Sequence, residues 1–116
     1  MGSVGWAEAT AAAFHMVKQE VCAEVAKPEW WNDEELKALS ARVVRAAPDD
    51  FQAHQMRAAV LIGGADRWEV VRPRSAAELM EAATHFERAA AMHSAPAMKA
   101  QSAFKAACCR SLAEAV

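Results

Sequence analysis

The stretch Asn32-Asp33-Glu34-Glu35-Leu36 returns 43 positions later as Ser75-Ala76-Ala77-Glu78-Leu79. The same offset pairs Val43 with Phe86. Each copy opens on a side chain that caps helices well and has a glutamate three residues later, which together form a start signal for an α-helix. An internal repeat of this length is typical of stacked helical hairpins, in which each unit buries its apolar face against the next.

A second repeat supports the first. Residues 56–61 (MRAAVL) reappear at an offset of 48 as residues 104–109 (FKAACC). Two kinds of helix therefore alternate along the chain, and each kind occurs at least twice. If the copies are equivalent, they bury the same faces, and Phe104, Cys108 and Leu112 would lie on the buried stripe of the last helix.

Proline and glycine mark the ends of the expected helices. Pro28 and Pro48 end two of them, Gly63-Gly64 ends a third, and Pro96 opens the last. The fold class is therefore all-α, with about five antiparallel helices in stacked hairpins or a small bundle, in one domain covering residues 1–116. The expected helices are about 7–26, 33–47, 50–62, 76–92 and 96–114, with an irregular segment at 63–74.

Composition excludes several classes of protein. Thirty residues are alanine and none is tyrosine, which favours helices over strands. A net charge of −2 gives no electrostatic bias toward nucleic acid, and no apolar run reaches the length of a membrane helix. Three cysteines form no even disulfide framework, so reduced thiols and an intracellular, cytoplasmic location are expected.

The repeated segments resemble the tetratricopeptide repeat. The second-helix signature of that family matches Ala82-x3-Phe86-x2-Ala89 and, more loosely, Leu39-x3-Val43-x2-Ala46. The first-helix signature matches the run from Ala53 through Ala58 to Leu61, with Ala106 at the corresponding small position. His54 and Ser102 stand where the family favours Trp. The resemblance covers about residues 33–110, and its spacing of 43 to 48 also leaves room for repeats of the HEAT class.

The resemblance implies a concave groove lined by the first helix of each hairpin. A groove of this kind would be small and weakly polar, suited to a helix or an extended peptide. Its lining would include Gln52, Gln55, Ala59 and Ile62, followed on the last helix by Ala100, Ala103, Ala107 and Arg110.

A second candidate surface lies in the irregular segment. Trp68 is flanked by Arg67, Arg72 and Arg74, so this loop would present a basic, aromatic surface to an acidic or aromatic partner. The alternative interpretation is that Trp30, Trp31 and Trp68 cover the ends of a thin, alanine-rich core.

No pattern predicts catalysis, a cofactor or a bound metal. The histidines at 15, 54, 85 and 93 lack the close-spaced partners of a zinc site and are expected to be surface or half-buried residues. Cys108 and Cys109 point about 100° apart on a helix and are expected to be core residues. The predicted function is non-catalytic binding of a protein or peptide. The alternative is a structural or self-associating domain, with a homodimer through the last helix or a place in a larger repeat array.

Overall fold

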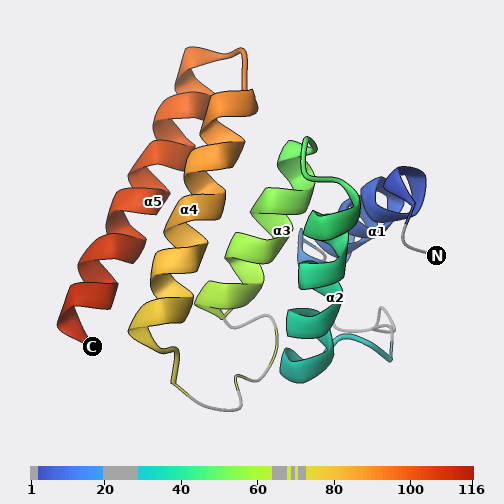
Figure 1. Ribbon diagram of the computed structural model, residues 1–116, viewed down its shortest axis with the longest axis horizontal. Coiled ribbons are helices and arrows are strands. Elements are labelled where there is room, and N and C mark those ends of the chain that lie inside the picture. Colours follow the sequence, from blue (N-terminus) through green and yellow to red (C-terminus); the bar gives the residue numbers. More distant parts are fainter. Residues whose placement is uncertain (1–2, 20–28, 64–67, 69, 71–72) are drawn as a thin grey trace.

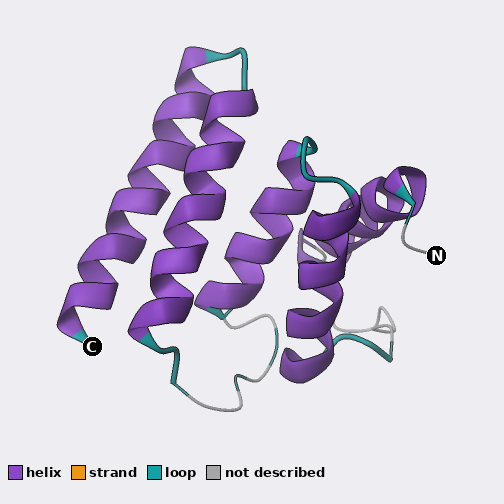
Figure 2. Cartoon of the chain, in the orientation of Figure 1, coloured by secondary structure: helices purple, strands orange, loops and turns teal. Residues whose placement is uncertain are grey.

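The computed structural model describes residues 3–19, 29–63, 68, 70 and 73–116, and most of them are helical. The helices are α1 (Val4–Gln19), α2 (Asp33–Ala46), α3 (Phe51–Ile62), α4 (Ala76–Met92) and α5 (Pro96–Ala115). The remaining described residues form loops and turns, and the described part of the chain contains no strand (Figure 2). The expectation of an all-α protein with five helices is therefore confirmed for these residues.

The boundaries of α2 to α5 agree with the expected ones to within one residue. α1 begins earlier than expected, at Val4. Ser3 explains this start, because its Oγ accepts a hydrogen bond of 3.1 Å from the backbone N–H of Trp6 and so caps the first turn. Residues 20–26 of the expected first helix lie outside the described residues.

Both capping signals of the repeat act as caps. Asn32 Oδ1 accepts from the backbone N–H of Glu35 at 3.0 Å at the start of α2. At the start of α4, Ser75 and Glu78 form a reciprocal capping box, with hydrogen bonds of 3.1 and 2.9 Å. The repeat therefore fixes where these two helices begin.

Gly63 ends α3 in the left-handed conformation, with φ of 98°. A Cβ atom at this position would also lie 3.0 Å from Val70 Cγ2, so both the backbone and the local packing favour glycine. Of the expected irregular segment 63–74, only residues 63, 68, 70, 73 and 74 are described.

Helices that follow one another in sequence pack together, and α1 also packs against α3 (Figure 1). α4 lies between α3 and α5, and residues 93–95 form the short connection between α4 and α5. The Cα radius of gyration is 13.7 Å, close to the ~13 Å expected of a compact chain of this size. None of the described helices combines the length and apolar character needed to cross a bilayer.

Two clusters of buried side chains form the core, and α3 contributes to both. The aromatic cluster joins α1, α2 and α3 to Trp68, and its larger members are Phe14, Leu36, Val43, Met56 and Val60. The alanine cluster joins α3, α4 and α5, and it consists of Ala58, Leu61, Ala82, Ala83, Phe86, Ala106 and Cys109.

The expected buried stripe of α5 is wrong. Phe104 is 70% exposed, Leu112 is 55% exposed, and Cys108 is exposed as well. The buried face instead consists of small side chains, namely Ser102, Ala106, Cys109 and Ala113. Small residues let α5 lie close against α4, whereas a phenylalanine on that face would hold the two helices apart.

Candidate functional site

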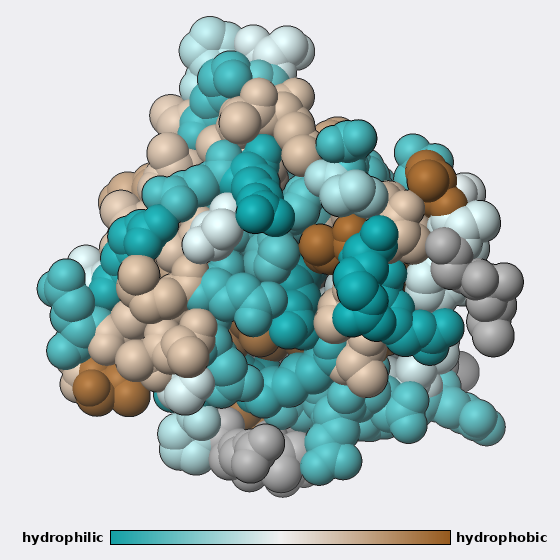
Figure 3. Space-filling view, in the orientation of Figure 1, coloured by the Kyte–Doolittle hydropathy of each residue, from teal (hydrophilic) through white to brown (hydrophobic). Residues whose placement is uncertain are grey.

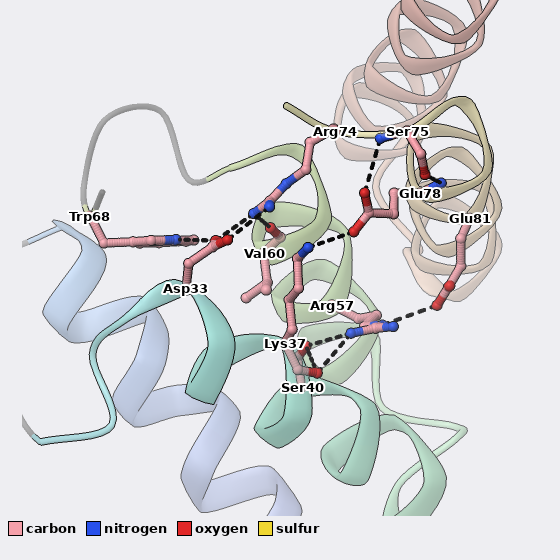
Figure 4. A network of polar contacts seen from close by, with 10 residues as sticks. All are labelled: Asp33, Lys37, Ser40, Arg57, Val60, Trp68, Arg74, Ser75, Glu78 and Glu81. Atoms are coloured by element: carbon pink, nitrogen blue, oxygen red, sulfur yellow. Dashed lines mark hydrogen bonds and ion pairs between the residues drawn. The ribbon is translucent and has the colours of Figure 1, made fainter. Parts of the chain in front are cut away.

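Two side chains of the irregular segment, Trp68 and Arg74, are anchored to the rest of the protein by hydrogen bonds (Figure 4). The indole of Trp68 is only 8% exposed, and its Nε1–H donates to Asp33 Oδ1 at 3.0 Å. Arg74 donates from both terminal nitrogens to the same carboxylate, and it also donates to the carbonyl oxygen of Val60 at 2.8 Å. The Asp33 carboxylate raises the pKa of Arg74 through these hydrogen bonds.

This arrangement changes the role expected for the segment. Trp68 packs among aromatic rings, with its centroid 5.4 Å from that of Trp31 and 6.0 Å from that of Phe14. Trp68 and Arg74 therefore fasten the segment to α2 and α3 and do not present a surface to a partner. Arg67 and Arg72, the other two members of the expected loop surface, lie outside the described residues.

A chain of polar contacts fixes α2, α3 and α4 relative to one another (Figure 4). Lys37 Nζ pairs with Glu78 Oε2 at 2.6 Å, and this hydrogen bond is the main reason why the pKa of Glu78 falls to about 2. Arg57 donates to the carbonyl oxygen of Lys37 and to Ser40 Oγ, and it pairs with Glu81 at 3.0 Å. One arginine of α3 therefore contacts both neighbouring helices.

A groove of about 420 Å³ opens between α1, α3 and α5, with Phe86 of α4 also lining it. Its apolar lining includes Ala59 and Ile62 of α3 and Met98 of α5. Its polar lining consists of His15, Lys18, Gln55, Gln101 and Lys105. The odd-numbered helices thus supply eight of the nine lining residues.

The groove contains part of the face that the sequence indicated. Gln55, Ala59 and Ile62 line it, whereas Gln52 does not, and the carbonyl oxygen of Gln52 lies 3.2 Å from Nε2 of His15. The last helix supplies a different set. Arg110 lies elsewhere and pairs with Glu87 on α4 at 2.5 Å.

The orientation of α5 about its axis explains why other residues of this helix line the groove than the sequence indicated. Because α5 turns its small residues toward α4, Met98, Gln101 and Lys105 line the groove. Ala100, Ala103 and Ala107, which were expected there with Arg110, are exposed and do not line it.

The groove is basic. Lys18, Lys105 and His15 line it, and none of the nine lining residues within the described part of the chain is acidic. The ammonium of Lys105 lies 5.8 Å from the centroid of the Phe86 ring, which holds the charge beside the apolar lining. Burial lowers the pKa of His15, against the opposing effect of its hydrogen bond to Gln52. At neutral pH the fixed positive charge therefore comes from the two lysines.

A second hollow of about 430 Å³ lies between α1 and α2. Trp6 and Trp30 line it together with Leu39, and the guanidinium of Arg42 lies 5.1 Å from the Trp6 ring centroid. Glu35 also lines this hollow, whereas the described lining of the groove between the odd-numbered helices contains no acidic side chain.

Two histidines depart from the expectation of surface or half-buried side chains. His54 is fully buried and His85 is 7% exposed, and their Nδ1 atoms lie 2.9 Å apart. No local pattern in the sequence distinguishes these two histidines from the other two. Cys108 is likewise exposed against expectation, whereas Cys109 is buried as expected, and burial raises the pKa of its thiol.

Within the described residues, no three His, Cys, Asp or Glu side chains are grouped so that they could hold a metal ion. The groove lining offers two amides, two lysines and a histidine beside apolar side chains, which suits recognition of a chain with apolar and acidic groups. No family model, no curated protein and no solved structure matches this chain.

Proposed function

We propose that the protein is a non-catalytic interaction module that binds a peptide or helix in the groove between α1, α3 and α5. The observation that carries the proposal is the described lining of this groove: an apolar set of Ala59, Ile62, Phe86 and Met98 beside two lysines, with no acidic side chain among the described lining residues. Amphipathic helices and extended peptides bind proteins in grooves of this kind.

The partner chemistry follows from the lining. Apolar side chains of the ligand would pack on Ile62, Phe86 and Met98, where displacement of water favours binding. Carboxylates of the ligand would approach Lys18 and Lys105, while a basic ligand would meet like charge. The preferred ligand is therefore an acidic amphipathic segment.

The proposal includes the architecture that the repeats indicate. In stacked hairpins of the tetratricopeptide type, the first helices of successive units form the concave face. Here α3 and α5 carry the two copies of that helix, and both contribute to the groove together with α1. Lining by alternate helices supports the assignment.

A peptide-display selection with a matched pair of variants tests the groove. Peptides selected on the wild-type protein should be acidic with spaced apolar residues, and Ile62→Glu should weaken their binding by about tenfold or more, measured by fluorescence anisotropy. Met80→Glu is the control, because Met80 is 41% exposed, Ile62 is 40% exposed, and Met80 does not line the groove. Selection of basic peptides, or equal binding by the Ile62 variant, would contradict the proposal.

The outer face of α5 favours self-association as a second candidate function. Phe104, Cys108 and Leu112 follow one another at intervals of four residues on this face, and Ala100 continues the series. Hydrophobic atoms lie over the C-terminal end of α5 (Figure 3). An uncharged stripe of large and small residues fits a second copy of the same helix.

Light scattering over a range of concentrations distinguishes this candidate from the groove. A dimer that Phe104→Glu converts to a monomer would support it, with Lys99→Glu on the same helix as the control. A monomer at every concentration would exclude it and would leave peptide binding in the groove unaffected.

A further inference from the structure

The two buried histidines join α3 to α4 through their ring nitrogens. Nδ1 of His54 lies 2.9 Å from Nδ1 of His85, and the rings are stacked at an interplanar angle of 26°. At this distance one of the two nitrogens carries a proton and donates a hydrogen bond to the lone pair of the other. Two unprotonated nitrogens would repel one another.

The outer nitrogens of the pair both face acceptors. Nε2 of His54 lies 2.7 Å from the carbonyl oxygen of Pro48, and Nε2 of His85 lies 3.1 Å from Oε2 of Glu81. A carbonyl oxygen has no proton to give, and neither does an ionised carboxylate. The chain from Pro48 to Glu81 therefore has three contacts between two terminal acceptors.

Counting protons shows that the neutral pair cannot satisfy this chain. Each of the three contacts needs one proton, and two neutral imidazoles carry one ring proton each. One contact is therefore left with lone pairs facing one another unless a further proton arrives from solvent.

The unsatisfied contact falls at Glu81. The contact between the two rings is buried, and the contact with the carbonyl oxygen of Pro48 is made by His54, whose side chain is fully buried. The side chain of Glu81 is 46% exposed and also accepts from Arg57 Nε at 3.0 Å, so it can turn to water and to Arg57. Moving it costs less than breaking a buried hydrogen bond.

We propose that His54 and His85 form a site for one proton, which sits on Nε2 of His85 and closes the contact with Glu81. A second proton is excluded, because it would place two N–H groups against one another 2.9 Å apart. The pair is thus an acid-sensitive joint between α3 and α4, adjacent in sequence to Gln55 and Phe86 of the groove.

The surrounding charges set the pH at which the proton binds. Burial lowers the pKa of His85 below its ordinary value of 6.5, the Glu81 carboxylate opposes this effect, and His54 and Arg57 add to it. The proton therefore binds below the usual range of histidine.

Four further charged groups on the packed helices are engaged in contacts of their own. Lys37 of α2 pairs with Glu78, Arg110 of α5 pairs with Glu87, Lys105 lies over Phe86, and Asp50 caps α3.

Nitrogen-detected NMR of the intact protein tests the proton count. Between about pH 7.5 and about pH 4.5, His54 should keep a protonated Nε2 and an unprotonated Nδ1, while His85 changes from one ring proton to two. Uptake of a full proton by each ring, or of none by the pair, would overturn the proposal.

Glu81→Gln provides a matched test. The glutamine amide can donate to Nε2 of a neutral His85, so all three contacts are satisfied without an added proton. The midpoint of proton uptake by His85 should fall by about one pH unit or more, a loss of at least about tenfold in proton affinity.

The control is Glu87→Gln, which removes a carboxylate of the same helix that pairs with Arg110. It should leave the midpoint unchanged. An unchanged midpoint in Glu81→Gln, or an equal shift in both variants, would overturn the assignment of the proton to His85. Circular dichroism of each variant confirms that the helices remain folded.

Discussion

The aromatic cluster and the alanine cluster hold the same helix, α3, by different means. In the aromatic cluster, Phe14, Trp31 and Trp68 meet with ring centroids 5.3 to 6.0 Å apart, and large side chains fill the space between helices. In the alanine cluster, Leu61 and Phe86 are the large side chains, and the remaining members are alanines and a cysteine. One region is stabilised by the burial of large apolar side chains, the other by close approach of helices.

This difference decides where large residues lie on the surface. Close packing of α4 and α5 requires small residues at their contact, so the large residues of α5 face outward. α3 is covered by both clusters, and its two exposed large residues, Phe51 and Ile62, lie at the two ends of the helix. Helices with similar sequences therefore bury different faces according to how many neighbours they have.

The largest expected loss of stability distinguishes a buried phenylalanine from an exposed one. Phe14→Ala removes a fully buried ring from the aromatic cluster and should lower the free energy of unfolding by about 4 kcal/mol. Phe104→Ala changes an exposed side chain and should alter it by less than about 0.5 kcal/mol in the monomer. Urea denaturation measures both values. Equal losses would show that α5 buries Phe104 and that the outward face assigned to it is wrong.

A somewhat smaller loss of stability is expected from a substitution at the edge of the aromatic cluster. Asp33→Ala leaves the Arg74 guanidinium, whose side chain is 6% exposed, without its carboxylate, and it also removes the acceptor of Trp68. The free energy of unfolding should fall by about 3 kcal/mol.

Glu34→Ala is the control for this variant, since Glu34 is the exposed neighbour of Asp33 on α2. It should change stability by no more than about 0.5 kcal/mol in urea denaturation. If the Asp33 variant lost as little, the ion pair would not be what holds Trp68 in the core.

Overpacking probes the alanine cluster directly. Ala106→Leu places a larger side chain between α4 and α5 and should cost about 2 kcal/mol, because the helices must move apart. Ala107→Leu, on the exposed side of the same helix, should be close to neutral. Thermal unfolding followed by circular dichroism compares the two. A neutral Ala106 variant would mean that the contact between the helices is loose.

The smallest effect concerns the ion pair between α2 and α4. The pKa of Glu78 is lowered to about 2, so its stabilising contribution is present above pH 4.5 and is lost as the pH falls toward 2. Lys37→Met should flatten this part of the curve of unfolding free energy against pH. Because the pair is partly exposed, the change should remain below about 1 kcal/mol. Lys99→Met, which leaves Glu78 paired, should retain the wild-type curve.

Local signals in the sequence predicted the helices well. Asn32 and Ser75 cap α2 and α4 as expected, and Val43 and Phe86, the matched pair of the repeat, are both buried. These features depend on residues close together in the chain. The groove was predicted in part, because Gln55, Ala59 and Ile62 lie on one face of α3, which the helical period fixes.

Features that depend on neighbours distant in sequence were not predictable. The repeat and the helical period placed Phe104 on a buried stripe, whereas the buried face of α5 depends on its contact with α4. The pairing of Asp33 with Arg74 spans 41 residues, and that of His54 with His85 spans 31. A polar residue in a sequence does not reveal whether a partner will be folded against it.

The adjacent cysteines of α5 can report how often the contact between α4 and α5 opens. Cys108 is exposed and Cys109 is buried, so a thiol-alkylating reagent should modify the first at once and the second only when α5 separates from α4. The rate at which Cys109 is alkylated after Cys108 would therefore measure how often α5 separates from α4. The residue that records this event is part of the contact itself.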